Sequence, residues 1–290
     1  MIGLKRGSVA LYPHEKEWDD EAKRTIEILK GILGDTAVDV QHVGSTAVAA
    51  ISAKPIIDVA AGVRSFDELL TKQAELENNG FYFRESRTDN QLLLACGSFY
   101  DGTGDEQTHF IHVVIYGGSE WQNYLLVRDY LNENLAAAKE YEALKFKLIE
   151  ECSAESGREQ YTEGKERFIN QLIRTALIEK YMGTTVKIGI DRPIGYVHEK
   201  EKYTLVYTIN YGYIPGVFGG DGEELDVYLL GVDEPVDEYF CEIIGVALRK
   251  NDCEDKLIAA PIGKRFTAEE ARAAIDFQEK WYDTEVQIVN

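Results

Sequence analysis

A run of acidic side chains lies in a glycine-rich turn in the C-terminal part of the chain. The segment INYGYIPGVFGGDGEELDVYLL, residues 209–230, holds four carboxylates and no basic residue, namely Asp221, Glu223, Glu224 and Asp226. Carboxylates at this spacing repel one another unless water screens them or a cation binds them. Oxygen ligands from one short loop are typical of a Mg²⁺ site, and the alternative is a solvated hairpin.

A second acidic group follows at the start of a later strand-like run. The segment NDCEDKL contributes Asp252, Glu254, Asp255 and Lys256. Strand alternation makes Asp226 project from its own strand, while Asp221 and Glu223 lie in the loop before it. Acidic groups at the ends of two strands favour a magnesium site over a solvated hairpin.

In the N-terminal half the candidate chemistry lies in HVGSTAVAAISAKPIIDV, residues 42–59. Gly44 and Ser45 follow a strand and are predicted to open a helix, where free N–H groups suit a phosphate and glycine permits its close approach. Asp58 lies in the next apolar strand, where an unpaired carboxylate is costly. A metal ion or a basic partner removes that cost, and Lys54 is either this partner or a phosphate contact.

The chain has two halves that differ in their predicted secondary structure, and these elements must position the residues above. Up to about residue 182, helical and strand patterns alternate, with helices expected near residues 18–33, 65–80, 120–152 and 158–182. The remainder reads as short strands separated by Gly, Pro and Asp, with one late helix. We therefore predict an α+β protein of two domains: a mixed sheet with flanking helices over residues 1–182, and a small, OB-like β-barrel with a terminal helix over residues 183–290.

Composition limits the class of partner. The 290 residues include 31 Lys and Arg against 51 Asp and Glu, a formal charge of −20. Such a charge repels nucleic acid and anionic membranes, and strongly acidic proteins often bind divalent cations. The four cysteines match no zinc spacing, and no stretch is apolar enough to cross a bilayer. We expect a cytoplasmic protein.

Six blocks in the N-terminal half resemble the GrpB-like nucleotidyltransferase family. They are YPHEKEW, HVGSTAV with AKPIIDV, THFIHVV, LLVRDYLNEN, EYEALK and YTEGKERFI. The resemblance implies metal-dependent nucleotidyl transfer, with Asp58 as catalytic acid and metal ligand. The residues that it places near the substrate are Gly44, Ser45, Lys54, Arg128, Lys145 and Lys165.

The second acid of the nucleotidyltransferase pattern is missing. It normally lies two residues after the first, and here that position is Ala60. A two-metal mechanism needs carboxylates that bridge both ions. His109 and His112 are the candidate replacements, but their odd spacing directs them to opposite faces of a straight strand. We select His112 as the metal ligand; a structural imidazole hydrogen-bonded within the sheet is the open alternative.

The C-terminal half, from about Thr184 onward, resembles the family I inorganic pyrophosphatases. The resemblance rests on NYGYIP, on the acidic turn and on the later loop that ends in Asp and Lys. It implies Mg²⁺ bound by Asp221, Asp226, Asp252 and Asp255. It also implies that Glu223 helps to deprotonate the attacking water and that Lys256 and Tyr211 contact phosphate. The family further hints at a homo-oligomer.

Two features depart from the pyrophosphatase pattern. Glu223 replaces the usual Asp, and the hairpin that brings a Lys and an Arg to the pyrophosphate is missing. The cations that lie in the right region to replace them are Arg192, His198, Lys200 and Lys202. We expect the C-terminal half to hydrolyse the pyrophosphate that the N-terminal half releases. The alternatives are hydrolysis of another phosphate compound, and a degenerate binding or oligomerisation module.

Overall fold

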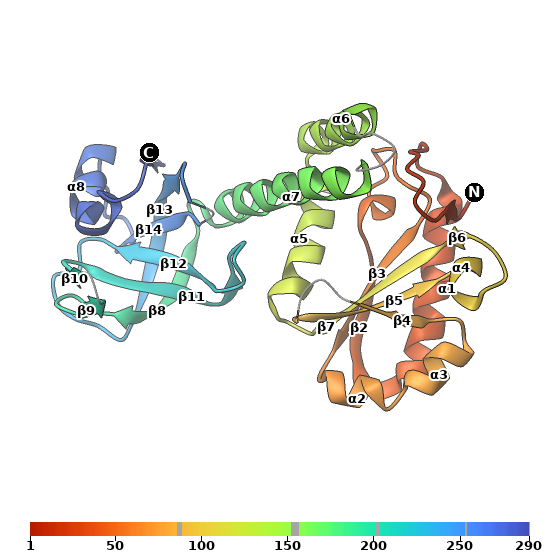
Figure 1. Cartoon of the computed structure of the whole chain (residues 1–290). Coiled ribbons are helices and arrows are strands. Elements are labelled where there is room, and N and C mark those ends of the chain that lie inside the picture. Colours follow the sequence, from red (N-terminus) through yellow and green to blue (C-terminus); the bar gives the residue numbers. More distant parts are fainter. Residues whose placement is uncertain (86–88, 152–156, 201–202, 253, 290) are drawn as a thin grey trace. The chain divides into compact units, whose positions relative to one another are not determined.

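The computed structural model describes residues 1–85, 89–151, 157–200, 203–252 and 254–289. The chain divides into two compact units, Met1–Gln171 and Leu172–Asn290, and the helix α7 (Gly157–Tyr181) contributes to both (Figure 1). The domain limits 1–182 and 183–290 stay a prediction. No helix in the described part of the chain is long and apolar enough to span a bilayer.

A five-stranded mixed sheet organises the first unit (Figure 1). Its order is β2-β3-β7-β5-β4, with β3 and β7 parallel and the other neighbours antiparallel. The predicted mixed sheet is therefore confirmed. The strands of this unit are β1 (Leu4–Lys5), β2 (Ala37–Val43), β3 (Ile57–Val63), β4 (Tyr82–Arg84), β5 (Gln91–Cys96), β6 (Glu106–Gln107) and β7 (His109–Ile115).

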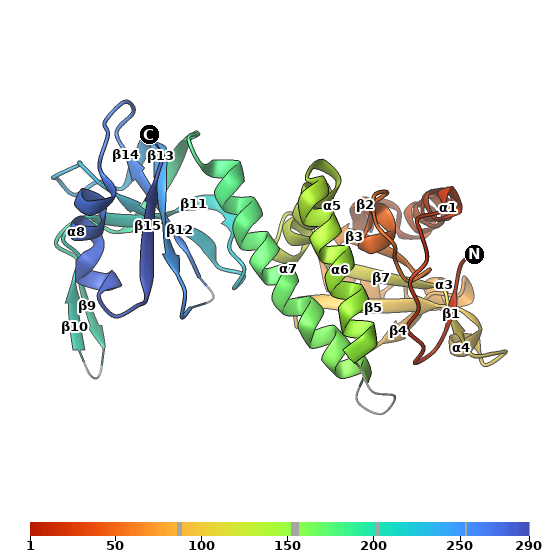
Figure 2. The same ribbon diagram turned by 90° about the horizontal axis from the view of Figure 1, so that it is seen from above.

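Helices cover both faces of this sheet. Helix α1 packs Trp18 and Leu29 against one face, and α5 packs Trp121 against the other. Figure 2 shows α6 beside the first part of α7, where the Tyr141 and Phe168 rings stack with centroids 5.5 Å apart. The helices are α1 (Lys16–Leu33), α2 (Phe66–Leu70), α3 (Gln73–Asn78), α4 (Ser98–Asp101), α5 (Ser119–Glu133) and α6 (Leu135–Glu151), with 3-10 turns η1 (Gly34–Thr36) and η2 (Ser45–Ala47).

Two long helices predicted from periodicity are interrupted. The helix expected over residues 120–152 ends at Asn134, whose Oδ1 accepts a hydrogen bond from the backbone N–H of Ala137 at 3.1 Å. An asparagine side chain that bonds to nearby backbone competes with the helix and favours a cap. The helix expected over residues 65–80 is likewise divided into α2 and α3.

The prediction that a helix opens at Ser45 is wrong. Residues Ser45–Ala47 form a single 3-10 turn. Ala53 already pairs with Tyr12 across a β-bridge, which leaves too few residues to offset the cost of helix nucleation. Any phosphate site at Gly44 therefore depends on side chains and single N–H groups, because no helix begins there.

The second unit is a small β-barrel, as predicted. Its strand order is β14-β12-β11-β8-β13, an additional β14–β13 pairing closes the barrel, and β15 extends β13. Helix α8 (Ala268–Glu279) begins with a capping box between Thr267 and Glu270 and is followed by β15. The strands are β8 (Thr185–Arg192), β9 (Val197–Lys200), β10 (Tyr203–Val206), β11 (Asn210–Phe218), β12 (Glu224–Leu229), β13 (Glu238–Arg249), β14 (Lys256–Ala260) and β15 (Thr284–Ile288).

The barrel core contains a buried ion pair. Arg249 is 2% exposed and Glu279 is fully buried, and the guanidinium donates from Nη2 to Glu279 Oε1 at 2.6 Å. Tyr228 and Thr284 also donate to this carboxylate. Since every carboxylate oxygen has a donor, α8 is tied to β13 and β12 through a fully hydrogen-bonded buried charge.

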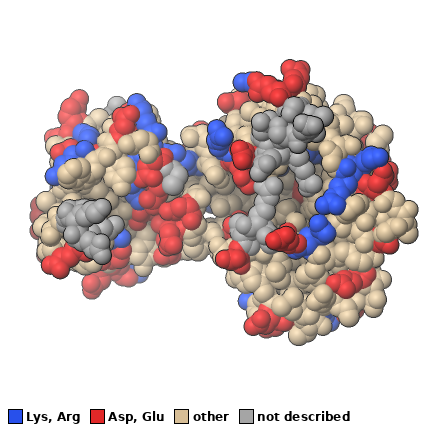
Figure 3. All heavy atoms as spheres, viewed as in Figure 1, with Lys and Arg blue, Asp and Glu red and all other residues tan. Residues whose placement is uncertain are grey.

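The surface agrees with the acidic composition. Figure 3 shows Asp and Glu side chains spread over the visible face of each unit, with Lys and Arg between them. Because acidic side chains outnumber basic ones, a pocket that binds an anion would depend on a few basic side chains that lie close together.

Candidate functional site

Gly44 and Asp58 meet at the ends of neighbouring strands in the first unit. In the pairing of β2 with β3, Asp58 lies opposite Val43, and Gly44 follows with φ at 71°. A Cβ atom at position 44 would lie 2.6 Å from Asp58 Oδ2. Glycine is thus required twice, by the left-handed backbone and by the carboxylate that occupies the space of its side chain.

His112 faces Asp58. Its Nε2 lies 3.1 Å from Asp58 Oδ1, and its Nδ1 lies 2.9 Å from the hydroxyl of Tyr124 on α5. The Tyr124 hydroxyl also donates to Gln91 Oε1 at 3.0 Å. This series of hydrogen bonds fixes the orientation of the His112 imidazole. Burial raises the pKa of Tyr124, so its hydroxyl stays neutral and can donate.

His109 points to the opposite face of the sheet, as its spacing predicts. Its Nε2 lies 3.1 Å from Thr25 Oγ1 on α1, and burial lowers the pKa of His109 to about 4. In the parallel pairing of β3 with β7, His112 lies opposite Ala60. The imidazole of His112 therefore stands on the face where a second acid at position 60 would project.

Three lysines from three segments, Lys54, Lys145 and Lys165, lie close enough to influence one another, and Lys165 lies near Asp58. The Lys54 ammonium lies 4.1 Å from the centre of the Tyr161 ring. Tyr141 and then Asp58 raise the pKa of Lys165. The structure therefore brings together three lysines that fall in separate parts of the sequence.

Lys145 is the most buried of the three, at 1% exposure, and its Nζ donates to the carbonyl of Ser52 at 2.5 Å. Burial, reinforced by Lys165 and Lys54, lowers the pKa of Lys145 to about 7. Its amine is therefore near the midpoint of its titration at neutral pH. An anion placed beside it would draw the proton onto the amine.

Ser45 and Arg128 complete the set predicted for this half. Ser45 Oγ donates to the Tyr141 hydroxyl at 3.3 Å, which joins the turn after β2 to α6. Arg128 Nη1 donates to Gln41 Oε1 at 3.0 Å and to the carbonyl of His42 at 3.1 Å. The guanidinium of Arg128 thus holds the strand that presents Gly44.

In the barrel, two carboxylates share one ammonium. Lys256 at the start of β14 is 3% exposed and forms ion pairs with Asp226 on β12 and with Glu254. Burial raises the pKa of Glu254 to about 7, and the neighbouring Asp226 carboxylate adds to the rise. Glu254 Oε2 also lies 3.9 Å from Arg249 Nη1, but that arginine already pairs with Asp252 and Glu279. The carboxylates of this region therefore outnumber its cations, which is the arrangement that attracts a further cation.

Glu254 lies in the predicted acidic group but was not among the predicted ligands, which were Asp252 and Asp255. Asp255 accepts from Arg174 Nε at 2.8 Å and from the backbone N–H of Arg249 at 3.0 Å. Asp252 Oδ2 lies 3.0 Å from Arg249 Nη1. Residues two apart in an extended segment point to the same side. The sequence position of Glu254, two residues before Lys256, therefore indicated that these two side chains would meet.

The remaining predicted magnesium ligand, Asp221, and the predicted proton acceptor, Glu223, are both exposed. Asp221 Oδ1 accepts from the N–H of Glu223 at 3.1 Å. In the described ranges no group of three or more His, Cys, Asp and Glu side chains is placed to hold a metal ion. The pair of Asp226 and Glu254 nevertheless fits Mg²⁺, which binds through one or two carboxylates and keeps several waters.

Tyr211 lies beside this pair, and Arg192 lies against the Tyr211 ring and pairs with Asp191 at 3.5 Å. Tyr211 is buried, and burial followed by Asp226 raises its pKa well above the usual range. The Arg192 guanidinium lies 5.1 Å from the centre of the Tyr211 ring and donates to the Tyr207 hydroxyl at 2.9 Å. The segment that was predicted to lack a hairpin does form a short one, because β9 pairs antiparallel with β10. Of the other replacement cations, His198 lies on β9, Lys202 falls outside the described residues, and the side chain of Lys200 is not described.

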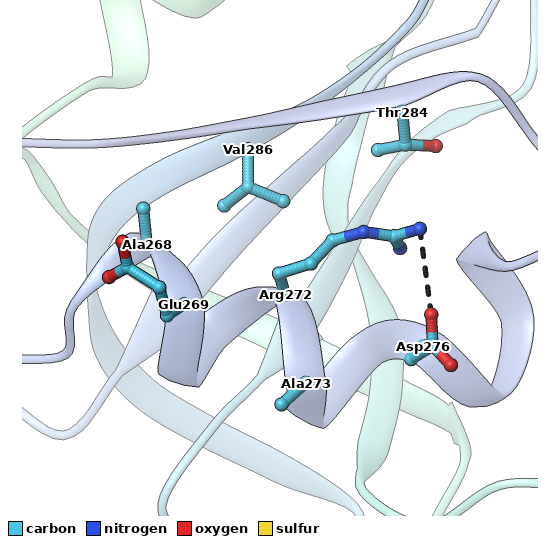
Figure 4. A pocket seen from close by; sticks show the side chains of 7 residues that line it. All are labelled: Ala268, Glu269, Arg272, Ala273, Asp276, Thr284 and Val286. Carbon is cyan, nitrogen blue, oxygen red and sulfur yellow. Dashed lines mark ion pairs between the residues drawn. The ribbon is translucent and has the colours of Figure 1, made fainter.

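A separate groove lies between α8 and β15 (Figure 4). It has a volume of about 700 Å³ and includes Arg272, whose Nη2 lies 3.5 Å from Asp276 Oδ1. None of its lining residues belongs to the predicted sites, and its charges of both signs give it no preference for an anion.

The fold and the polar residues define a two-domain α+β protein, with a mixed-sheet domain followed by a closed barrel that carries an acidic cluster. Residues 8–175 match the family model described as GrpB protein, and residues 176–285 match that of inorganic pyrophosphatase. The chain belongs to the GrpB family, and its C-terminal part is an inorganic pyrophosphatase family domain.

Two individual proteins agree with the assignment to the GrpB family. Glutamate-rich protein GrpB of Alkalihalophilus pseudofirmus is 34% identical over 173 residues, 60% of this chain and 98% of that protein. The crystal structure of the conserved protein GrpB from Enterococcus faecalis matches 59% of this chain and 99% of its own, with 27% identity and a TM-score of 0.52. An inorganic pyrophosphatase from Ehrlichia chaffeensis matches 37% of this chain and 88% of its own, with 18% identity and a TM-score of 0.31. The assignment of the C-terminal part rests on the family model.

Proposed function

We propose that the protein is a Mg²⁺-dependent phosphate enzyme whose barrel hydrolyses inorganic pyrophosphate. The observation that carries the proposal is the cluster in which Asp226 and Glu254 share Lys256 beside Tyr211 and Arg192. Carboxylates that hold a cation, next to basic and hydroxyl groups that hold phosphate, are the parts that phosphoryl transfer to water requires.

In this proposal Asp226 and Glu254 would hold Mg²⁺, and the loop before β12 would contribute Asp221 and Glu223. A bound Mg²⁺ would neutralise charge on the phosphate and make a nearby water more acidic. Glu223 accepts the proton of the attacking water.

Substrate binding is assigned to the basic and hydroxyl groups of the same cluster. Arg192 and Lys256 attract the phosphate oxygens, and the neutral Tyr211 hydroxyl donates to one of them. A cluster with these two described cations is expected to have a lower affinity for pyrophosphate than a cluster with several lysines and arginines.

Phosphate release from pyrophosphate by the full-length protein tests this function. We expect release that requires Mg²⁺ and stops with a chelator, and weaker or no release from a panel of nucleoside di- and triphosphates and sugar nucleotides. Faster release from a compound of that panel would identify a different phosphate substrate. No release from any of them by protein that binds Mg²⁺ would overturn the hydrolase proposal.

For the first unit we propose nucleotide binding and nucleotidyl transfer. Lys54, Lys145 and Lys165 supply positive charge for a polyphosphate, and Gly44 and Ser45 supply a close approach for its oxygens. Asp58 and His112 together offer one carboxylate and one imidazole to a divalent cation. The support for this proposal is that Lys165 lies near both Asp58 and Lys145, although these groups come from β3, α6 and α7, and that His112 on β7 faces Asp58.

Gly44→Ala is expected to weaken binding of ATP with Mg²⁺ at least about tenfold, because the new Cβ displaces the Asp58 carboxylate and strains the backbone. Isothermal titration of the full chain measures this. Gly80→Ala is the matched control, since Gly80 has φ at 85° and open space around its Cβ position. Equal affinities for the two variants would place the nucleotide elsewhere, and wild-type protein that binds no nucleotide would overturn the proposal.

A further inference from the structure

The loop between β13 and β14 is held by two arginines. Arg249 at the end of β13 pairs with Asp252 inside the loop, and its backbone N–H donates to Asp255. The second arginine is Arg174, from α7. Glu254, one of the two carboxylates on Lys256, belongs to this loop.

Arg174 makes a dense set of contacts. Its Nε and Nη2 donate to the two oxygens of Asp255, the first at 2.8 Å. Nη1 donates to the carbonyl of Asp252 at 3.2 Å, and Nη2 also donates to the carbonyl of Arg249 at 3.1 Å. The guanidinium therefore holds the loop at three residues, and a bidentate pair fixes direction as well as distance.

This anchor acts on the chain neighbour of Glu254, which itself pairs with Lys256 and, at 3.9 Å, with Arg249. Asp255 is 8% exposed and turns toward Arg174, and its two chain neighbours, Glu254 and Lys256, meet each other in an ion pair. If Arg174 were removed, Arg249 would still hold the loop through its ion pair with Asp252. A shift of about 1 Å in a catalytic group is enough to slow an enzyme about a hundredfold.

We propose that Arg174 is a positioning residue of the barrel site: it holds Asp252 and Asp255 in place so that Glu254 meets Asp226 at Lys256. As far as it concerns hydrolysis, this inference rests on the proposed function. Arg174 lies within residues 8–175, which match the GrpB model, yet it belongs to the compact unit Leu172–Asn290. The barrel site thus depends on a residue outside the segment that matches the pyrophosphatase model, residues 176–285.

The test compares Arg174→Met and Arg174→Lys with the wild type as full chains. Arg265→Met is the matched control, because Arg265 is an exposed arginine of the same unit that pairs with Glu242. Amide hydrogen exchange of residues 249–256 reports on the loop, and exchange of β11 and β12 reports on the barrel as a whole. Rates of Mg²⁺-dependent pyrophosphate hydrolysis are measured on the same samples.

For Arg174→Met we expect exchange in residues 249–256 to rise at least about tenfold while β11 and β12 stay protected, and kcat to fall at least about tenfold. Arg174→Lys is expected to give exchange rates and kcat values between those of Arg174→Met and the wild type, because lysine keeps the positive charge but loses the bidentate geometry of the guanidinium. Loop exchange equal to that of Arg265→Met, or the same rise in every strand, would overturn the positioning role. If the wild type hydrolyses no pyrophosphate, the proposed function fails, and the exchange data alone decide whether Arg174 fixes the loop.

Discussion

Asp226→Asn is expected to lower the kcat of Mg²⁺-dependent pyrophosphate hydrolysis at least about 10³-fold, which corresponds to about 4 kcal/mol. Asp226 projects from β12 into the ion pair with Lys256, and it is the strand-borne member of the proposed magnesium pair. An amide keeps the shape of the side chain but loses the charge that binds the cation. Lys256 retains Glu254 as a partner, so the fold should survive the change.

Phosphate release and Mg²⁺ titration on the same preparation check this prediction. Asp233→Asn is the matched control, because Asp233 is an exposed acid in the loop after β12 and should leave both quantities unchanged. An Asp226→Asn protein with the magnesium affinity of the wild type would place the cation elsewhere. It would also favour a barrel that serves as a binding or oligomerisation module.

Glu279→Gln is expected to destabilise the barrel by about 3–5 kcal/mol. The charge of Arg249, at 2% exposure, would then remain buried without its carboxylate partner. A glutamine also presents one acceptor oxygen in place of two, although Arg249, Tyr228 and Thr284 all donate to this side chain. The loss of a charged acceptor that several buried donors share explains the size of the effect.

Calorimetric unfolding of the full chain measures this change. Glu269→Gln is the control, because Glu269 lies in the first turn of the same helix, α8, and is exposed. Its transition should stay within about 0.5 kcal/mol of the wild type. Equal melting of the two variants would show that the buried ion pair contributes little to the barrel.

Strand alternation made the sheet face of several site residues predictable. The odd spacing of His109 and His112 sends them to opposite faces, and only His112 reaches Asp58. The same rule puts Asp226 and Tyr228 on one face of β12, with Tyr228 in the barrel core. These predictions succeed because a period of two is a local property of the backbone.

The partners of the loop residues were not predictable in the same way. Asp255 turns toward Arg174, which is 81 residues away in the sequence, and no local pattern announces that contact. The convergence of Lys54, Lys145 and Lys165 also depends on how α6 and α7 pack. From the sequence alone, without a family resemblance, each of these lysines would be interpreted as an ordinary surface charge. The interruption at Asn134 came from a side chain that competes with the helix, which periodicity does not register.

The close approach of Gly44 to Asp58 also bears on how this family can vary. A side chain at position 44 and a carboxylate at position 58 claim the same volume, since a Cβ would lie 2.6 Å from Asp58 Oδ2. An acid at position 58 therefore excludes a side chain at position 44, whereas loss of the acid would remove only the steric requirement, because the backbone at φ 71° still favours glycine. Within the GrpB family, a residue other than glycine at this position would mark members that have abandoned the chemistry of Asp58.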